Sequence, residues 1–222
     1  MSDDDLRSTD DPAPASPAES LRLIEDQRAA TRRSLSPDPR LIYWPWGIAW
    51  FVGFGLLYLR FGPDDTVTVD MPTWVPLTAL FVLMGIAFVV SGVTGARSYR
   101  QISGDSSRRG LRYGLAWFLA FSMFGPLAGR LSDLLPPADR GLLWAAGSVA
   151  IVATLYLAGS AIWLDRAMFV LGGWLAIVNV AGIAAGPGWH SLIICLGGGI
   201  GMFVSGLAEY ARPRRLLRGR TA

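Results

Sequence analysis

The chain has 222 residues, of which 52% are hydrophobic and 17% are charged, and its formal net charge is +3. Soluble domains carry about 25% charged residues, so this balance argues against an ordinary soluble domain and favours a membrane protein. The basic residues are all arginines that fall between apolar runs rather than in one patch. The sequence therefore does not indicate a nucleic-acid-binding protein.

The first forty residues form a polar N-terminal tail. Residues 1–17 are rich in Asp, Ser, Pro and Ala, a composition that predicts disorder. Ser16, Pro17 and Glu19 have the spacing of a capping box, which predicts a short amphipathic helix over about residues 17–33. Such a helix would lie on the inner leaflet of the membrane or, alternatively, dock a soluble partner. The prolines of the segment 36–39 are expected to end it.

Six apolar segments follow and predict an all-α fold, a polytopic transmembrane domain over residues 41–208. The first segment reads LIYWPWGIAWFVGFGLLYL and would form a helix about 28 Å long, which matches the hydrocarbon thickness of a bilayer. The spans are expected over residues 41–59, 73–96, 113–129, 141–164, 167–185 and 189–208. Pro126 is expected to kink the third span, and residues 209–222 are expected to form a basic cytoplasmic tail.

The distribution of arginines predicts the orientation in the membrane. With the N-terminus inside, most arginines flank the spans on the inner side, and only Arg60, Arg130 and Arg140 fall on the outer side. Tryptophan and tyrosine residues lie near the ends of the spans, as in an aromatic belt. We therefore expect a plasma-membrane protein with both termini in the cytoplasm.

Small residues at four-residue spacing predict close packing between spans. Gly197 and Gly201 belong to a glycine run in the sixth span, which either packs against a neighbouring helix or lines a path. Residues 47–54 and 114–121 also resemble one another, which would fit a repeat of three helical hairpins, although these residue types are abundant enough to match by chance. The small residues would also suit a homo-oligomer or another membrane partner.

Few polar side chains fall inside the predicted spans. Asn179 is the most polar side chain near the middle of a span, and it either hydrogen-bonds a neighbouring helix or contacts a substrate. Glu209 lies at the cytoplasmic end of the sixth span and is expected to pair with an arginine. His190 is the only histidine, and we expect it to form an interfacial pair with Trp189. Cys195 is the only cysteine, so no disulfide forms within the chain.

The loop between the second and third spans is rich in serine and arginine. Its arginines could contact an anionic lipid head group, or they could serve only as positive charge on the inner side. These arginines are Arg97, Arg100, Arg108, Arg109 and Arg112.

Several motifs together resemble a group of uncharacterised six-span bacterial integral membrane proteins. The motifs are LRLIEDQRAATRRSLSPDPR, YWPWGIAWFVGFG, SSRRGLRYGLAWFLAF and AGPGWH, and the resemblance covers the chain from about residue 21 onward. Members of this group are sometimes labelled as transporters. The resemblance carries over no functional residues.

The sequence favours a transport-related membrane protein, a small permease or efflux component. The alternative is a scaffold or regulatory protein whose cytoplasmic helix and basic tail bind a partner or anionic lipid. A membrane enzyme ranks last, because no catalytic or metal-ligand motif is present, and we expect neither enzymatic activity nor a cofactor.

Overall fold

The computed structural model describes residues 16–35, 38–99 and 105–218, and over these residues the chain is all-α, which confirms the predicted class. The chain divides into two units, Met1–Ser36 and Pro37–Ala222. We describe each unit by itself.

The first unit contains one helix, α1 (Pro17–Leu35). The backbone N–H of Glu19 donates to Oγ of Ser16 at 3.2 Å, so the predicted N-terminal cap is present. Leu21, Leu23 and Ile24 are exposed within this unit. Residues 1–15, for which we predicted disorder, lie outside the described part.

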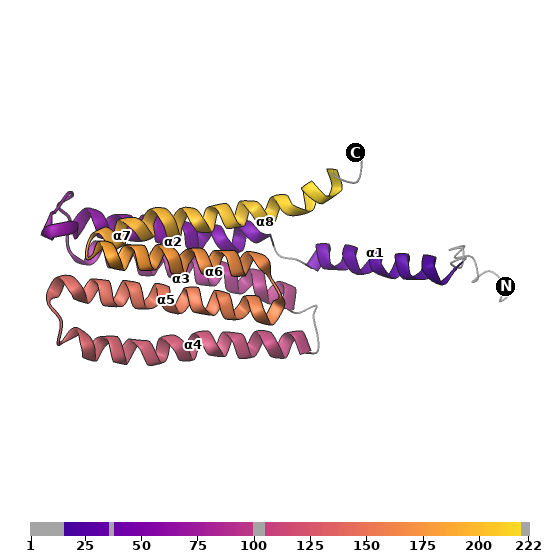
Figure 1. Cartoon of the computed structure of the whole chain (residues 1–222), viewed down its shortest axis with the longest axis horizontal. Helices are drawn as coiled ribbons and strands as arrows, with labels where there is room; N and C mark the ends of the chain where they lie inside the picture. The colour runs from indigo at the N-terminus through magenta and orange to yellow at the C-terminus, as the bar shows by residue number, and fades with distance from the viewer. Residues whose placement is uncertain (1–15, 36–37, 100–104, 219–222) are drawn as a thin grey trace, which may run out of the picture. The chain divides into compact units, whose positions relative to one another are not determined.

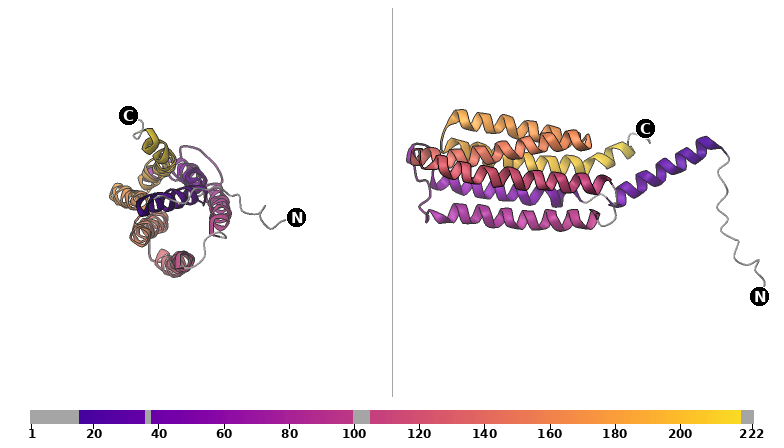
Figure 2. Two further views of the ribbon diagram at one scale, coloured as in Figure 1. Left: turned by 90° about the vertical axis from the view of Figure 1, so that its right-hand side faces the viewer. Right: turned by 90° about the horizontal axis from the view of Figure 1, so that it is seen from below.

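The second unit is a bundle of long helices that lie side by side (Figures 1 and 2). Within the described residues, six helical segments are long and apolar enough to cross a membrane, so the predicted multi-pass architecture is confirmed. The elements are α2 (Pro39–Arg60), α3 (Trp74–Tyr99), α4 (Asp105–Ser132), α5 (Pro137–Trp163), α6 (Arg166–Ala185), α7 (Trp189–Ile193), the π-helical turn η2 (Ile194–Gly199) and α8 (Ile200–Arg218). The last three form the sixth span.

α4 and α8 extend furthest beyond their predicted ends. α4 begins at Asp105 rather than at residue 113, and α8 continues to Arg218 through much of the predicted basic tail. A helix satisfies its own backbone hydrogen bonds in water as well as in lipid, so the edge of the membrane does not have to end it. α4 also continues through Pro126 to Ser132.

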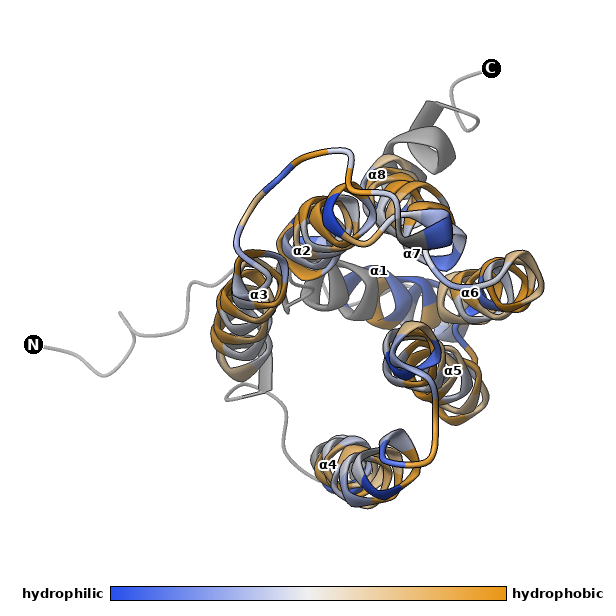
Figure 3. Cartoon of the chain, turned by 90° about the vertical axis from the view of Figure 1, so that its left-hand side faces the viewer, coloured by the Kyte–Doolittle hydropathy of each residue, from blue (hydrophilic) through white to orange (hydrophobic). Residues whose placement is uncertain are grey.

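Seen end-on, the bundle forms an arc with α3 at one end and α4 at the other (Figure 3). α3 packs against α2, α2 packs against α8 and η2, and α6 packs against α5, α7 and the remainder of the sixth span. α4 packs against α5. The buried core therefore lies between α2, α5, α6 and the sixth span, and includes Trp50, Leu171, Leu175, Ile194 and Met202.

Tryptophan side chains connect several pairs of spans. The indole of Trp46 in α2 donates to Oγ of Ser91 in α3 at 3.0 Å, and that of Trp144 in α5 donates to Oγ of Ser132 in α4 at 2.9 Å. Trp44 in α2 donates to the Phe203 carbonyl in α8 at 3.3 Å. Indole groups expected to form an aromatic belt at the interface therefore also hold neighbouring helices together.

The loops at the end of the bundle that holds Pro63 and Gly188 pack against each other. Gly188 has φ 78°, and a Cβ atom at this position would collide with Pro63 in the short helix η1 (Pro63–Asp65). The Nε group of Arg60 donates to the Met71 carbonyl at 2.8 Å, which closes the α2–α3 loop. This tight packing determines where α7 begins.

Candidate functional site

The described transmembrane core contains one connected polar pair, Asn179 and His190. Their side chains are 3% and 2% exposed. Nε2 of His190 lies 2.9 Å from Oδ1 of Asn179, and Nδ2 of Asn179 donates to the Ala146 carbonyl at 3.0 Å. The pair therefore joins α5, α6 and α7 near the end of the bundle where α6 stops.

Two glycines allow the chain to bring His190 inward. Gly186 ends α6 with φ 90°, and Gly188 precedes α7 with φ 78°, conformations that suit glycine because it lacks a Cβ atom. The chain reverses between these glycines, and α7 then packs against α6. His190 is the second residue of α7, so its side chain enters the core immediately after the turn.

The imidazole lies directly against the backbone of α6. A Cβ atom on Gly182 would lie 2.7 Å from Cδ2 of His190 and 3.3 Å from its Cγ. Only a glycine gives the ring this space, so Gly182 and Asn179, three residues apart, form one surface for the imidazole.

The hydrogen bonds determine which ring nitrogen carries the proton. The Ala146 carbonyl can only accept, so Asn179 must present its NH₂ group to Ala146 and its carbonyl oxygen to His190. Nε2 is then the protonated donor, and Nδ1 of the neutral ring is an acceptor. Among the described residues, Nδ1 is buried and has no hydrogen-bond partner.

The expectation that His190 forms an interfacial pair with Trp189 is wrong. Trp189 instead packs near Tyr58, with ring centroids 6.1 Å apart, while His190 is buried against α6. Asn179 does hydrogen-bond a neighbouring helix, as expected for a polar side chain in a span. The sequence places Asn179 and His190 eleven residues apart on either side of a turn, so no helical spacing could join them.

The glycines of the sixth span lie at close contacts with its neighbours. A Cβ atom at Gly197 would lie 2.7 Å from Val178 in α6, and one at Gly201 would lie 2.8 Å from the indole nitrogen of Trp174. That indole donates to the Gly197 carbonyl at 2.8 Å, in the π-helical turn η2. Whether these glycines take part in transport as well as in packing stays a prediction.

A second polar cluster lies at the opposite end of the bundle. Glu209 in α8 is half-buried and follows His190 by 19 residues, about 28 Å along the sixth span. The guanidinium of Arg40 lies 3.9 Å from the ring centroid of Tyr210, the next residue. Arg40 also binds Asp38 at 2.7 Å. This hydrogen-bonded ion pair holds the pKa of Asp38 below its ordinary value of 3.8.

The structure does not bring the predicted site residues together. Asn179 and Glu209 lie near opposite ends of the bundle, and Arg108, Arg109 and Arg112 are exposed on the first turns of α4. Arg100 and the side chain of Arg97 lie outside the described residues. The predicted contact with anionic lipid therefore stays a prediction. Within the described part, no group of three or more His, Cys, Asp or Glu side chains is placed to hold a metal ion.

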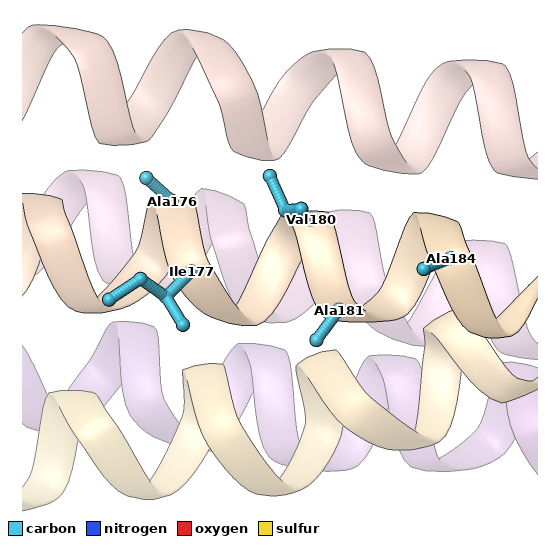
Figure 4. A pocket seen from close by; sticks show the side chains of 5 residues that line it. All are labelled: Ala176, Ile177, Val180, Ala181 and Ala184. Carbon is cyan, nitrogen blue, oxygen red and sulfur yellow. The ribbon is translucent and has the colours of Figure 1, made fainter.

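A shallow apolar pocket of about 450 Å³ lies along α6 (Figure 4). Its lining residues are Ala176, Ile177, Val180, Ala181 and Ala184. Ile177 and Val180 are exposed, whereas Asn179 on the same helix is buried. The pocket therefore lies on a different face of α6 from the polar pair and presents only apolar groups.

In comparisons with known proteins, no family model, no curated protein and no solved structure matches the chain. The resemblance to a six-span bacterial family accordingly stays a prediction, and the geometry of the bundle alone supports the functional argument.

Proposed function

We propose that the protein is a transport-related membrane component, a small permease or efflux subunit, and that its six spans hold a solute-binding point at His190. The observation that carries this proposal is the buried Nδ1 acceptor that has no partner among the described residues. Leaving such a group unsatisfied costs about 1–3 kcal/mol, and the burial of His190 keeps bulk water from offsetting that cost. A bundle that served only as an anchor would not need a buried polar group that lacks a partner.

The π-helical turn in the sixth span supports the same proposal. The π-helical turn η2 begins four residues after His190, and one of its carbonyls is bound by the indole of Trp174 in another span. π-Helical turns often occur at functional sites. A buried acceptor close to a π-helical turn therefore suits a binding site.

We also propose that the N-terminus is cytoplasmic, because the arginine-rich segments then face the cytoplasm. The α2–α3 loop and His190 would then lie toward the outer face. In this orientation a solute arriving from outside would meet the imidazole before it reached the apolar middle of the bundle.

Flux through purified protein in proteoliposomes tests the proposal. Glycerol and urea serve as probe solutes, and the shrinking and swelling rates are measured by light scattering. In His190→Gln, the side-chain amide can still donate to Asn179, but its own acceptor, Oε1, does not occupy the position of Nδ1. We expect at least one probe to cross faster than in empty liposomes, and His190→Gln to lower that rate about tenfold, corresponding to the loss of one hydrogen bond.

Ser191→Ala is the matched control, because Ser191 follows His190 in α7 and is only half-buried. It should keep the wild-type flux. A wild-type rate equal to that of empty liposomes for both probes, or an unchanged rate in His190→Gln at equal protein density, would refute the proposal.

A scaffold or regulatory function is the second candidate, and the exposed apolar residues of α1 favour it. Leu21, Leu23 and Ile24 offer an apolar surface on a helix that forms a unit of its own. If α1 docks a partner, removing residues 1–33 will abolish co-purification of that partner with the intact bundle. Unchanged co-purification would exclude this function for α1.

A further inference from the structure

Nδ1 of His190 can act only as a hydrogen-bond acceptor in the observed arrangement. The fixed Asn179 amide places the ring proton on Nε2, and the contact with Gly182 holds the Cδ2 edge of the ring against α6. Nδ1 lies on the other edge of the imidazole. A partner for Nδ1 must therefore supply a hydrogen atom from an N–H or O–H group.

The surroundings of the ring favour an uncharged partner. Besides α6, the elements that pack against α7 include α2, α5 and η2, and η1 packs against Gly188 just before α7. Arg60, Asp64, Asp65, Asp139 and Arg140 lie at the same end of the bundle as His190, and Arg40 and Arg166 lie at the other end. Among the described side chains, none of these charged groups bonds to the imidazole, whose Nε2 contacts Asn179 and whose Nδ1 has no partner. The tyrosines on these elements are Tyr43 and Tyr58 in α2 and Tyr156 in α5.

A charged ligand at Nδ1 would be buried without an opposite charge beside it. Burying an unpaired ion costs much more than burying a neutral polar group. Since His190 is 2% exposed, a large ligand would also have to displace packed helices. The cost of burying a charge and the lack of exposed surface at His190 both favour a small neutral molecule as the ligand of Nδ1.

We infer that Nδ1 of His190 is the acceptor in a binding site for a small uncharged solute that carries an N–H or O–H donor, a class to which urea and glycerol belong. This inference rests on the proposed function, because it assigns the solute class to the same site. It adds that binding requires a donor group and excludes cations and anions.

The chain contains a single histidine, which permits a direct test by nuclear magnetic resonance. Protein labelled with ¹⁵N-histidine and reconstituted in lipid nanodiscs will show one Nδ1 and one Nε2 resonance. We expect Nε2 to be protonated and Nδ1 to be unprotonated. Addition of urea or glycerol should move the Nδ1 resonance upfield in a saturable way, at concentrations that do not lower the melting temperature.

Two control solutes test whether the shift requires a neutral solute that donates a hydrogen bond to Nδ1. Tetramethylurea lacks N–H groups, and methylammonium carries N–H groups together with a positive charge, so neither should produce a saturable shift. Ser191→Ala should respond as the wild type does. In Asn179→Leu, the ring loses its anchor, and we expect both tautomers to appear and the saturable response to weaken.

A protonated Nδ1 in the wild-type protein, the absence of a saturable shift with both urea and glycerol, or an equal response to tetramethylurea would overturn the inference. Bound water that neither solute displaces would also overturn it, since the Nδ1 resonance would then stay constant. The two proposals fail separately. Flux without a shift at Nδ1 would leave transport by the bundle standing and would refute solute binding at His190, whereas a shift without flux would keep the site and refute transport.

Discussion

At the scale of single residues, the side chains of Asn179 and His190 hydrogen-bond each other. Both are buried, and the Asn179 amide uses its NH₂ group on the Ala146 carbonyl and its oxygen on the imidazole. Because both side chains are buried, neither group can turn to bulk water instead. The pair therefore fixes the relative positions of α5, α6 and α7 while leaving Nδ1 available.

Asn179→Ala removes both hydrogen bonds of this pair at once. It leaves Nε2 of His190 and the Ala146 carbonyl without the amide. We expect a loss of stability of about 1–3 kcal/mol, measured by thermal unfolding in detergent, together with reduced flux. A variant that melts and transports as the wild type does would show that the pair carries neither role.

Gly182→Ala tests the contact between the imidazole and α6. The new Cβ atom would lie 2.7 Å from Cδ2 of His190 and must displace the ring. Gly173→Ala is the matched control on the same helix, because no atom lies within 4 Å of its Cβ position. Gly173→Ala should be neutral or stabilising by up to about 1 kcal/mol from helix propensity.

We expect Gly182→Ala to destabilise the protein and to change the ¹⁵N spectrum of His190, whereas Gly173→Ala should leave that spectrum unchanged. Equal melting temperatures and identical spectra for the two variants would contradict the packing described here.

At the scale of elements, the sixth span packs directly against the backbone of α2 at Gly199. A Cβ atom at this position would lie 3.0 Å from Cβ of Phe51 and 3.1 Å from its Cα and backbone nitrogen. Backbone atoms of a packed helix cannot move aside as a flexible side chain can. The two segments would have to separate along their contact.

Gly199→Ala is therefore expected to destabilise the bundle by about 1–3 kcal/mol, the usual cost of overpacking. Gly92→Ala in α3 is its control, because no atom lies within 4 Å of the corresponding Cβ position. Thermal unfolding of the two variants in the same detergent measures the difference. A Gly199 variant as stable as the Gly92 variant would refute this close approach.

The ion pair at the start of α2 makes a prediction about pH. Asp38 caps α2 by accepting from the Arg40 backbone N–H at 2.9 Å, and its carboxylate binds the Arg40 guanidinium, which lies over Tyr210 of α8. The folded-state pKa of Asp38 lies below 3.8, so its contribution to stability is present above pH 3.8 and is lost as the pH falls through the folded-state pKa.

We expect Asp38→Asn to be less stable than the wild type at neutral pH and to approach it at pH 3, as thermal unfolding at both values would show. Because both side chains are partly exposed, the difference should be small and should shrink with added salt. An equal difference at the two pH values would contradict a role for the carboxylate charge.

At the scale of the whole molecule, composition and apolar run length were sufficient to predict the six spans and the all-α class, because a bilayer imposes a minimum length on every crossing helix. The cap at Ser16 was also predictable, since it depends on local spacing. The inward position of His190 was not predictable, because it depends on the φ angles of Gly186 and Gly188 and on the contact of Gly188 with Pro63.

The suspected hairpin repeat also could not be judged from the sequence alone. Gly47 and Gly114 occupy matching places in the two similar segments, but Gly47 packs against Gly199 and Phe203, whereas Gly114 has no neighbour within 4 Å of its Cβ position. Gly92 and Gly159, at the same offset, differ in the same way: Gly92 is open and Gly159 contacts Tyr113. The similar segments therefore do not occupy equivalent packing positions.

The account depends most on the chain crossing the membrane with the α2–α3 loop and the start of α4 on opposite sides. Cysteine labelling in intact cells measures this directly, because Cys195 is the only cysteine and is buried. In a Cys195→Ala background, a membrane-impermeant maleimide should label Asp64→Cys in intact cells, and should label Arg109→Cys only after the membrane is permeabilised. Labelling of both positions from the outside, or of Arg109→Cys alone, would contradict the account.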